Sequence, residues 1–277
     1  MKFKLIALTL CLGIIFALCG CSGNDVVGGS SETSSLAQTI TSSKAEISSE
    51  VSSNEVSSNE VSSSEVSSSE NETSSLISNT DYTPIDDEEY LLMLTNPWVP
   101  LPEGFKPRTT PIPAGYGAWA NMHFATIGFD DLIQMMDDAK KDGIKLILVS
   151  STRTMAEQQS LFDNKVNRVM AANPDYTRKQ AEIEAATAVA IPGTSEHQLG
   201  LAVDFNTTDD NFRYSEEFKW LQEHCYDYGF IYRYPDGKKD TTGIIPEPWH
   251  YRYVGKENAK KIKESGKVFE EYLATLD

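Results

Sequence analysis

A run of short Ser/Glu repeats limits how much of this chain can fold. Residues 22–80 are dominated by Ser, Glu, Thr and Asn, and from position 50 to position 70 a glutamate returns every five residues with one valine in each interval. One β-branched residue in five cannot line a helix or strand face, so burial would not offset the entropy lost on ordering. The pattern predicts a disordered, self-repelling tether over residues 21–80 and leaves residues 81–277 for a folded domain.

The N-terminus has the features of an export signal. Residues 1–4 carry two lysines, and residues 5–18 are apolar but too few to span a bilayer comfortably. The segment Leu-Cys-Gly-Cys that ends at Cys21 resembles the lipobox of bacterial lipoproteins, in which that last cysteine receives the lipid. An ordinary cleavable signal with incidental cysteines is the alternative. We expect residues 1–20 to be a lipoprotein signal peptide and Cys21 to anchor the protein to the outer face of the bacterial cell membrane, from which the tether reaches into the cell wall.

Charge and cysteine content exclude some partners and cross-links. The chain has a formal net charge of −17, whereas a nucleic-acid-binding protein would present a basic face. Only Cys225 lies outside the N-terminal segment, so the mature chain cannot form an internal disulfide. We expect Cys225 to be a small buried residue, and the protein to be a monomer with no nucleic-acid partner.

The hydrophobic pattern after residue 81 is that of a globular domain long enough for one core. Apolar spacing predicts helices at 129–142, 154–172, 177–190, 216–228 and from 256 onward, and strands at 145–150, 200–205, 230–234 and 249–254. These strands and helices do not alternate in a regular βα rhythm. The pattern therefore favours a single α+β domain with a small, mainly antiparallel sheet flanked by helices.

Two residues seven positions apart are the first candidates for chemistry. Between His197 and Asp204 lies Gly200, which permits a tight turn, and the residues that follow it have the apolar character of a strand. Such a turn would bring both side chains to one metal ion. The spacing alone fits a surface histidine and a strand-end aspartate equally well, so the interpretation depends on a second motif.

The second motif is Glu-Pro-Trp-His at residues 247–250. Pro248 argues against the helix of the His-Glu-x-x-His metalloproteases, because proline cannot supply an interior helical hydrogen bond, and we expect an irregular segment that leads into a strand. The two motifs together offer two imidazoles, one ligand carboxylate and one spare carboxylate. A catalytic zinc uses three protein ligands and keeps one position for water. The spare carboxylate of Glu247 would then serve as base toward the water and as acid toward the leaving amine.

Taken in order, the motifs resemble those of one enzyme family. The chain carries Ser-x-His-x-x-Gly-x-Ala-x-Asp at residues 195–204, Glu-x-Trp-His-x-Arg-Tyr at 247–253 and Ser-Thr-Arg-Thr at 151–154. These segments are similar to the zinc D-alanyl-D-alanine carboxypeptidases related to VanY, a family that includes LD-carboxypeptidases and VanX-type dipeptidases. The similarity spans most of residues 96–273, and several motifs in the same order are far more specific than any one of them.

The resemblance implies a set of metal ligands. His197, Asp204 and His250 match the residues that bind Zn²⁺ in the family. His123 and His224 match no ligand position, and we expect both to be ordinary structural or surface residues.

The resemblance also implies roles in catalysis and substrate binding. Glu247 would be the catalytic carboxylate, and Arg153 would stabilise the oxyanion or hold the substrate carbonyl, which suits a fixed positive charge. Ser195 would help to bind the terminal carboxylate of the substrate, and Gln158 would support the loop of Arg153 unless it only packs there. The family usually has Tyr immediately before the arginine, where this chain has Thr152. This departure puts the wall of the substrate site near the arginine in question.

The export signal, the tether and the site lead to one functional hypothesis. We expect a zinc-dependent carboxypeptidase that removes the C-terminal D-alanine from peptidoglycan stem peptides outside the cell. LD-carboxypeptidase action on tetrapeptide stems is the first alternative, because it uses the same metal and acid-base groups. A non-catalytic wall-binding module would have lost a ligand or the catalytic carboxylate, and none is lost. A VanX-type dipeptidase would have no evident use for a long tether.

Overall fold

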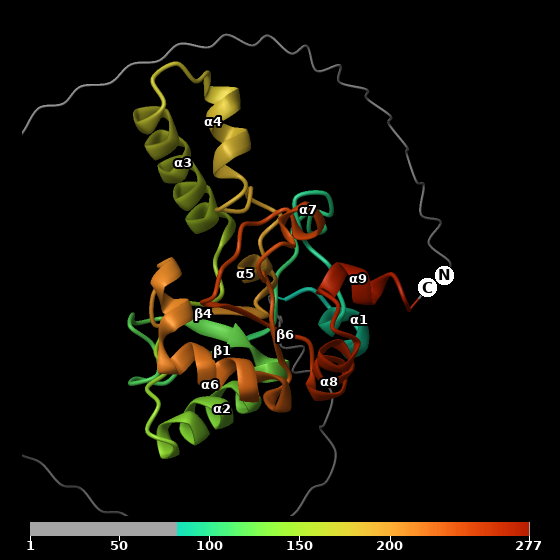
Figure 1. Cartoon of the computed structure of the whole chain (residues 1–277). Coiled ribbons are helices and arrows are strands. Elements are labelled where there is room, and N and C mark those ends of the chain that lie inside the picture. The colour runs from blue at the N-terminus through green and yellow to red at the C-terminus, as the bar shows by residue number, and fades with distance from the viewer. Residues whose placement is uncertain (1–81, 277) are drawn as a thin grey trace, which may run out of the picture. The chain divides into compact units, whose positions relative to one another are not determined.

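The structure is a computed structural model that describes residues 82–276 (Figure 1). The predicted signal peptide, the lipidation site Cys21 and the predicted tether lie outside the described residues and stay predictions. Within the described part, no helix has the length and the apolar character required to cross a bilayer.

The centre of the fold is a four-stranded antiparallel sheet in the order β3-β4-β6-β5. Its strands, each shorter than predicted, are β3 (Leu148–Ser150), β4 (Ala202–Phe205), β6 (His250–Tyr253) and β5 (Phe230–Tyr232). A second sheet pairs β1 (Thr109–Pro111) with β2 (His123–Ala125), also antiparallel. With the helices around them, these sheets confirm the predicted α+β class with a small, mainly antiparallel sheet.

One face of the central sheet packs into the main hydrophobic core. Because side chains alternate along a strand, Val203 and Phe205 of β4 point to the same face, and with Tyr251 of β6 they are fully buried in this core. Helices α2 (Phe129–Lys141) and α6 (Glu216–His224) cover that face (Figure 1). Both helices contribute leucine side chains to the same core, together with methionines of α2 and a tryptophan of α6.

The opposite face of the sheet carries polar residues. Asp204 of β4 pairs with His250 of the neighbouring strand β6, and with Ser150 of β3, the neighbouring strand along the other edge of β4. Residues that oppose one another in an antiparallel pair share a face of the sheet. Strand pairing alone therefore brings together two of the predicted metal ligands, which lie far apart in the sequence.

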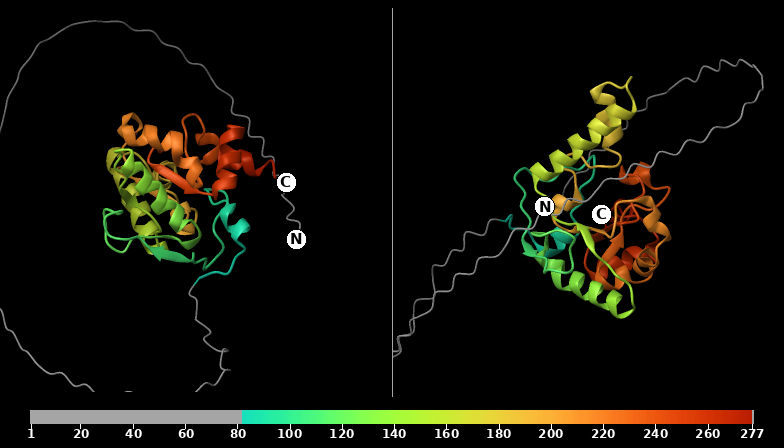
Figure 2. Two further views of the ribbon diagram at one scale, coloured as in Figure 1. Left: turned by 90° about the horizontal axis from the view of Figure 1, so that it is seen from below. Right: turned by 90° about the vertical axis from the view of Figure 1, so that its left-hand side faces the viewer.

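A helical hairpin projects away from the central sheet (Figures 1 and 2). It consists of α3 (Met155–Ala172) and α4 (Arg178–Ala185), and each helix begins with a capping box, from Thr154 and from Thr177. Its hydrophobic cluster is separate from the main core and consists of Phe162, Val166, Val169, Ala181 and Ala185. We call this unit the α3–α4 hairpin.

The C-terminal helices form a third packing unit. The helical stretch predicted from residue 256 is α8 (Lys256–Ser265) and α9 (Phe269–Leu273), separated by Gly266 with a φ of 63°. Their apolar side chains pack against Ile231 of β5 in a cluster of their own. Near them lies α1 (Asp87–Leu91) (Figure 1).

Several short elements were not predicted from the sequence. They are α1, β1, β2, η1 (Thr126–Gly128), α5 (Glu196–Leu199), η2 (Asp210–Tyr214) and α7 (Lys239–Thr242). Elements of three to five residues contain too few positions to show a reliable hydrophobic period. The helix predicted at 216–228 is α6 followed by the 3-10 helix η3 (Cys225–Tyr228), in which Cys225 is fully buried as expected.

The second helix of the hairpin ends five residues before its predicted end. Beyond it, the carbonyl oxygen of Thr187 accepts a hydrogen bond from the backbone N–H of Ile245 at 2.8 Å, and that of Ala190 accepts one from the side chain of Gln158 at 2.7 Å. These tertiary hydrogen bonds hold the segment after α4 against other parts of the fold. The segment 188–190 is therefore irregular, and it lines the cleft described below.

The core packing yields a stability prediction. Leu132 of α2 is 0% exposed and Ile183 of α4 is 60% exposed. We expect Leu132→Ala to lower the free energy of unfolding by about 2–5 kcal/mol, because it removes buried methyl groups and leaves a cavity. The matched variant Ile183→Ala should change it by no more than about 0.5 kcal/mol. Urea denaturation followed by circular dichroism measures both, and equal effects would contradict the assignment of the core.

Candidate metal centre and its cleft

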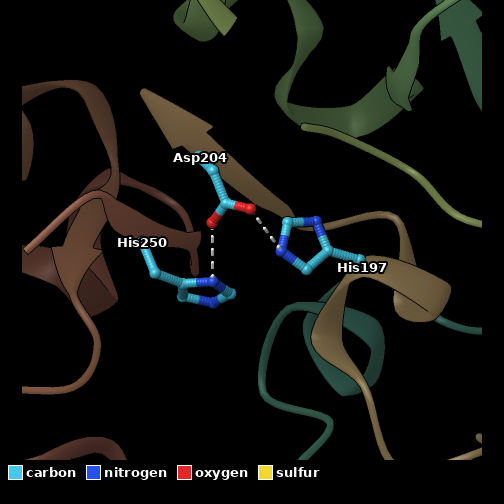
Figure 3. Close-up of side chains that lie close together, drawn as sticks. All are labelled: His197, Asp204 and His250. Carbon is cyan, nitrogen blue, oxygen red and sulfur yellow. Dashed lines mark hydrogen bonds and ion pairs between the residues drawn. The ribbon is translucent and has the colours of Figure 1, made fainter. Parts of the chain in front are cut away.

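Three side chains able to bind one metal ion point toward one another from three elements (Figure 3). His197 lies on α5, Asp204 on β4 and His250 on β6. One donor atom from each lies within 4.8 Å of the other two, and all three residues are buried. The structure thus brings together the residues that the sequence analysis assigned as ligands.

A one-turn helix and a glycine place His197 beside the sheet. The hydroxyl group of Ser195 caps α5 by accepting the backbone N–H of His197, and Gly200 ends the helix with a φ of 81°. A Cβ at Gly200 would also lie 3.0 Å from the Cβ of Pro107, so another residue there would be strained as well as crowded. The turn expected between the two motif ligands is therefore a helix end that only glycine fits well.

Hydrogen bonding selects which nitrogen of His197 can bind a metal. Its Nδ1 lies 2.8 Å from the carbonyl oxygen of Ser151, which can only accept, so Nδ1 carries the proton and donates it. The lone pair of Nε2 is therefore available to bind a metal ion. Nε2 lies 3.2 Å from Oδ2 of Asp204, on the side of the centre.

The second histidine is held from both sides. Nδ1 of His250 lies 3.1 Å from Oδ1 of Asp204, and its Nε2 lies 3.3 Å from Oε2 of Glu196. Burial opposes the charged ring, but the hydrogen bonds to these two carboxylates raise the pKa of His250 to about 9. A metal ion that binds here must therefore displace a proton from Nδ1, while the Nε2–H continues to donate to Glu196.

Glu196 is a buried carboxylate that the sequence analysis did not single out. Its Oε1 accepts hydrogen bonds from Arg233 at 2.8 Å and from Arg252 at 3.1 Å, and all three side chains are fully buried. Burial disfavours the ionised form, yet the two guanidinium groups hold the pKa of the Glu196 carboxyl well below its usual range. Arg233 in turn binds Glu270 of α9 through two hydrogen bonds. The only sequence signal for this cluster was an acidic residue inside a metal-ligand motif.

The donor set fits zinc. Two imidazole nitrogens and one carboxylate oxygen, without cysteine, are typical of catalytic zinc sites, which have three protein ligands. The ring-to-carboxylate distances of 3.2 and 3.1 Å are close to the roughly 3.3 Å between neighbouring donors around a tetrahedral ion at about 2.0 Å. Burial, with Arg153 nearby, lowers the pKa of His197 to about 4, so that ring is neutral, as a ligand must be.

Glu247 lies beside the centre and is not one of the three converging ligands. Its Oε2 is 3.7 Å from Nδ1 of His250, and the residue is 9% exposed. Its carbonyl oxygen accepts the backbone N–H of His250 at 3.0 Å, which closes a turn before β6 in place of a helix, as Pro248 indicated. Burial raises the pKa of the Glu247 carboxyl to about 8. Such a carboxyl group can take up and return a proton near neutral pH.

Arg153 is held against the centre by three partners. Its guanidinium group donates to Oδ2 of Asp204 at 3.1 Å, to the hydroxyl oxygen of Ser150 at 2.7 and 3.0 Å, and to Oε1 of Gln158 at 3.1 Å. Gln158 is fully buried, and its amide nitrogen donates to the carbonyl oxygen of Ala190. Gln158 therefore links Arg153 to the segment after α4. One N–H of Nη1 has no bond within the described part of the chain and is free to contact a substrate.

Three residues that the sequence analysis discussed lie apart from the centre. His123 faces Thr109, with 3.3 Å between Nδ1 and the hydroxyl oxygen, and the ring of His224 packs on Trp220 with centroids 4.6 Å apart. The hydroxyl group of Thr152 is buried and has no hydrogen-bond partner among the described residues. None of these three residues lines the cleft that contains the metal centre.

The metal centre forms the floor of an open cleft of about 370 Å³. Arg153, Ser195 and Glu247 line the cleft beside the three ligands. Its walls come from α3 on one side and from the segments 188–190 and 244–245. A cleft with convergent polar groups at its floor suits a ligand whose polar end enters first.

Comparison with known proteins supports the assignment of this site as a metal centre. The family model VanY, D-alanyl-D-alanine carboxypeptidase, matches residues 124–256. A D-alanyl-D-alanine carboxypeptidase of Enterococcus faecalis is 43% identical over 195 residues, which cover 69% of this chain and 68% of the relative. A mutant of the vancomycin resistance D,D-pentapeptidase VanY from a VanB-type cassette, in complex with Zn(II), is 40% identical with a TM-score of 0.59, over 67% of this chain and 99% of that one. The LdcB LD-carboxypeptidase is 34% identical with a TM-score of 0.59, over 70% and 93%.

The contact between Glu196 and His250 predicts an effect on metal affinity. We expect Glu196→Gln to weaken zinc binding by about 10–100-fold, because a neutral amide orients the ring less firmly and lowers its basicity. Competition with a chromophoric chelator measures the affinity of the purified protein.

Glu270→Gln is the matched control for that variant. The substitution neutralises the second carboxylate that Arg233 binds, and this carboxylate does not contact the histidine. The variant should therefore be less stable but keep its zinc affinity within about threefold of wild type. Equal losses of affinity in the two variants would show that the buried ion cluster acts only through stability.

Proposed function

The chain belongs to the family of VanY D-alanyl-D-alanine carboxypeptidases, and we propose that it is a zinc-dependent enzyme that removes the C-terminal D-alanine from peptidoglycan stem peptides. The observation that carries the proposal is the position of Glu247, a carboxylate that stands beside a three-donor centre at the floor of an open cleft. A metal held by three side chains, with a fourth group beside it able to act as a base, can support metal-dependent peptide hydrolysis.

Zinc is the metal in this proposal, bound by His197, Asp204 and His250. The related VanY structure that contains Zn(II) supports this choice, as does the donor set. Bound there, zinc would polarise the carbonyl group of the scissile bond and lower the pKa of a water molecule.

Glu247 handles the proton in the proposed reaction. Its Oε2 lies near the centre, and burial raises its pKa above that of an exposed glutamate, which suits a group that acts in turn as general base and general acid. The carboxylate would accept the proton of the attacking water and return it to the amine of the departing alanine. This residue supplies both proton-transfer steps, so its loss should affect the rate far more than substrate binding.

Arg153 and Ser195 position the substrate. The guanidinium group is held rigidly by its three partners and keeps one N–H of Nη1 for the substrate, where it would stabilise negative charge on the carbonyl oxygen. Ser195 lines the cleft next to His197 and would bind the terminal carboxylate. These contacts would align the last peptide bond with the centre and favour cleavage at the C-terminal end.

LD-carboxypeptidase action on tetrapeptide stems is the second candidate. The similarity to the LdcB LD-carboxypeptidase favours it, with 34% identity and a TM-score of 0.59. The two reactions use the same proton-transfer and metal-binding groups, and they differ in the chirality of the residue before the cut. Thr152, where the family usually has Tyr, directly precedes Arg153 but does not line the cleft, so this residue does not decide between the two reactions.

For the place of action, we propose that the protein is lipid-anchored at Cys21 on the outer face of the bacterial membrane and acts as a monomer. The apolar leader and the lipobox-like segment in the sequence support the anchor. Residues 21–80 would connect the anchor to the catalytic domain and let the domain reach stem peptides in the wall.

The central test removes the proposed base. In the purified protein, Glu247→Gln should lower kcat/KM for alanine release from a pentapeptide stem by about 10²–10⁴-fold, because no group is left to move the proton. The variant should still bind zinc. Mass spectrometry follows alanine release, and a chelator should abolish it in wild type until zinc is restored.

Glu257→Gln, an exposed acid on α8, is the control and should retain wild-type activity. Activity that persists with chelator would rule out the metal mechanism, and wild-type activity in Glu247→Gln would rule out Glu247 as the base. Release from a tetrapeptide stem but not from a pentapeptide would assign the LD reaction instead.

The anchor is tested separately in the full chain expressed in a bacterium. Cys21→Ala should move the protein out of the membrane fraction, since it removes the thiol that carries the lipid, whereas Cys19→Ala should leave it there. Immunoblots of fractionated cells give the distribution. A Cys21→Ala protein that still partitions fully with membranes would contradict lipidation.

A further inference from the structure

The cleft extends from the metal centre along the α3–α4 hairpin. Three residues of α3 line it, and these are Leu161, Lys165 and Arg168. Their spacing of four and three positions places them on one face of the helix. The cleft wall therefore carries two cations at a distance from the bond-cleaving groups.

Packing of the hairpin fixes the direction of this face. The neighbouring face of α3 is buried against α4 through Phe162, Val166 and Val169. Each of these residues lies next to a cleft-lining residue in the sequence. As long as the hairpin keeps its own hydrophobic cluster, α3 cannot rotate, and both cations stay directed toward the cleft.

The two cations are not neutralised by the protein. Among the described residues, neither Lys165 nor Arg168 has an ion pair or a side-chain hydrogen bond, whereas Arg178 of the same hairpin pairs with two acidic residues. Lys165 is half-buried, and Arg168 is exposed. In a chain with a formal net charge of −17, two cations without an ion-pair partner among residues 82–276, on a wall of the reaction cleft, are placed to bind an external anion.

We propose that Lys165 and Arg168 form a subsite for a free carboxylate of the substrate, on the N-terminal side of the bond that is cut. The proposal rests on the function proposed above. It makes the enzyme selective for acidic stem peptides and not for any peptide that ends in D-alanine.

The length of the helix sets where that carboxylate lies. Arg153, which contacts Asp204 at the centre, stands two residues before Met155, the first residue of α3, and Lys165 lies ten residues beyond Met155. These ten residues correspond to roughly 15 Å of helix at 1.5 Å per residue. An extended peptide covers the same distance in about four to five residues. Since lysine and arginine side chains reach back several ångströms, the carboxylate belongs about three to five residues before the C-terminus.

Two pentapeptide substrates test the subsite. They are identical, including the two C-terminal D-alanines, but carry either a free carboxylate or a carboxamide on the second residue. Wild type should prefer the carboxylate peptide in kcat/KM by about tenfold, mainly through KM, and the preference should shrink as ionic strength rises. In Lys165→Ala/Arg168→Ala the ratio should fall to near one.

Lys179→Ala is the matched control. Lys179 is an exposed cation of α4 without an ion pair in the described part of the chain, and it does not line the cleft. This variant should keep the wild-type ratio. Equal rates for the two peptides in wild type, or a ratio that survives in the double variant, would overturn the subsite.

A binding measurement separates this proposal from the proposed function. Calorimetry with zinc-loaded Glu247→Gln gives Kd for both peptides without turnover, and the carboxylate peptide should bind about tenfold more tightly unless Lys165 and Arg168 are also replaced. If wild type cleaves neither peptide, the proposed function fails, and the Kd ratio still decides on the subsite. Equal Kd values would reject the subsite even if both peptides are cleaved.

Discussion

The buried carboxylate of Glu196 connects the metal centre to the rest of the fold. One of its oxygens accepts hydrogen bonds from Arg233 and Arg252, and the other meets His250. Buried charges are tolerated only when they are fully paired. The elements that carry these side chains must therefore pack in the one arrangement that pairs all of them. Arg233 extends the same network to Glu270 on the last helix. Through Glu196, the orientation of a metal-binding ring therefore depends on Arg233, Arg252 and Glu270, none of which lines the cleft.

Sequence analysis was most successful where the information is local. The metal-binding residues and Glu247 stand in two short motifs, and the apolar period of α2 and α3 places these helices within a residue or two of their observed bounds. The role of Glu196 was not visible, because its partners Arg233 and Arg252 lie 37 and 56 residues further along the chain. One-turn helices such as α5 and α7 also escaped prediction, since isolated turns form only when tertiary contacts support them.

The metal centre and the proposed substrate subsite pack on different hydrophobic clusters of this domain. The sheet that carries the metal centre packs on the main core, whereas the wall formed by α3 depends on the hairpin's own cluster. Gln158 bridges the two, since it contacts Arg153 at the centre and Ala190 after the hairpin. In the proposed function, substitutions on the exposed wall would therefore change which peptide is accepted without disturbing the groups that move protons.

The complete set of metal ligands depends on the register of β4 and β6. Asp204 and His250 oppose each other only in the native pairing, and a slip of one residue would turn one of them to the other face of the sheet. No local segment contains all three ligands, because they extend from position 197 to position 250. A chain whose central strands have not yet paired cannot hold the ion with its full ligand set. The complete metal site therefore exists only when the central strands are paired in their native register.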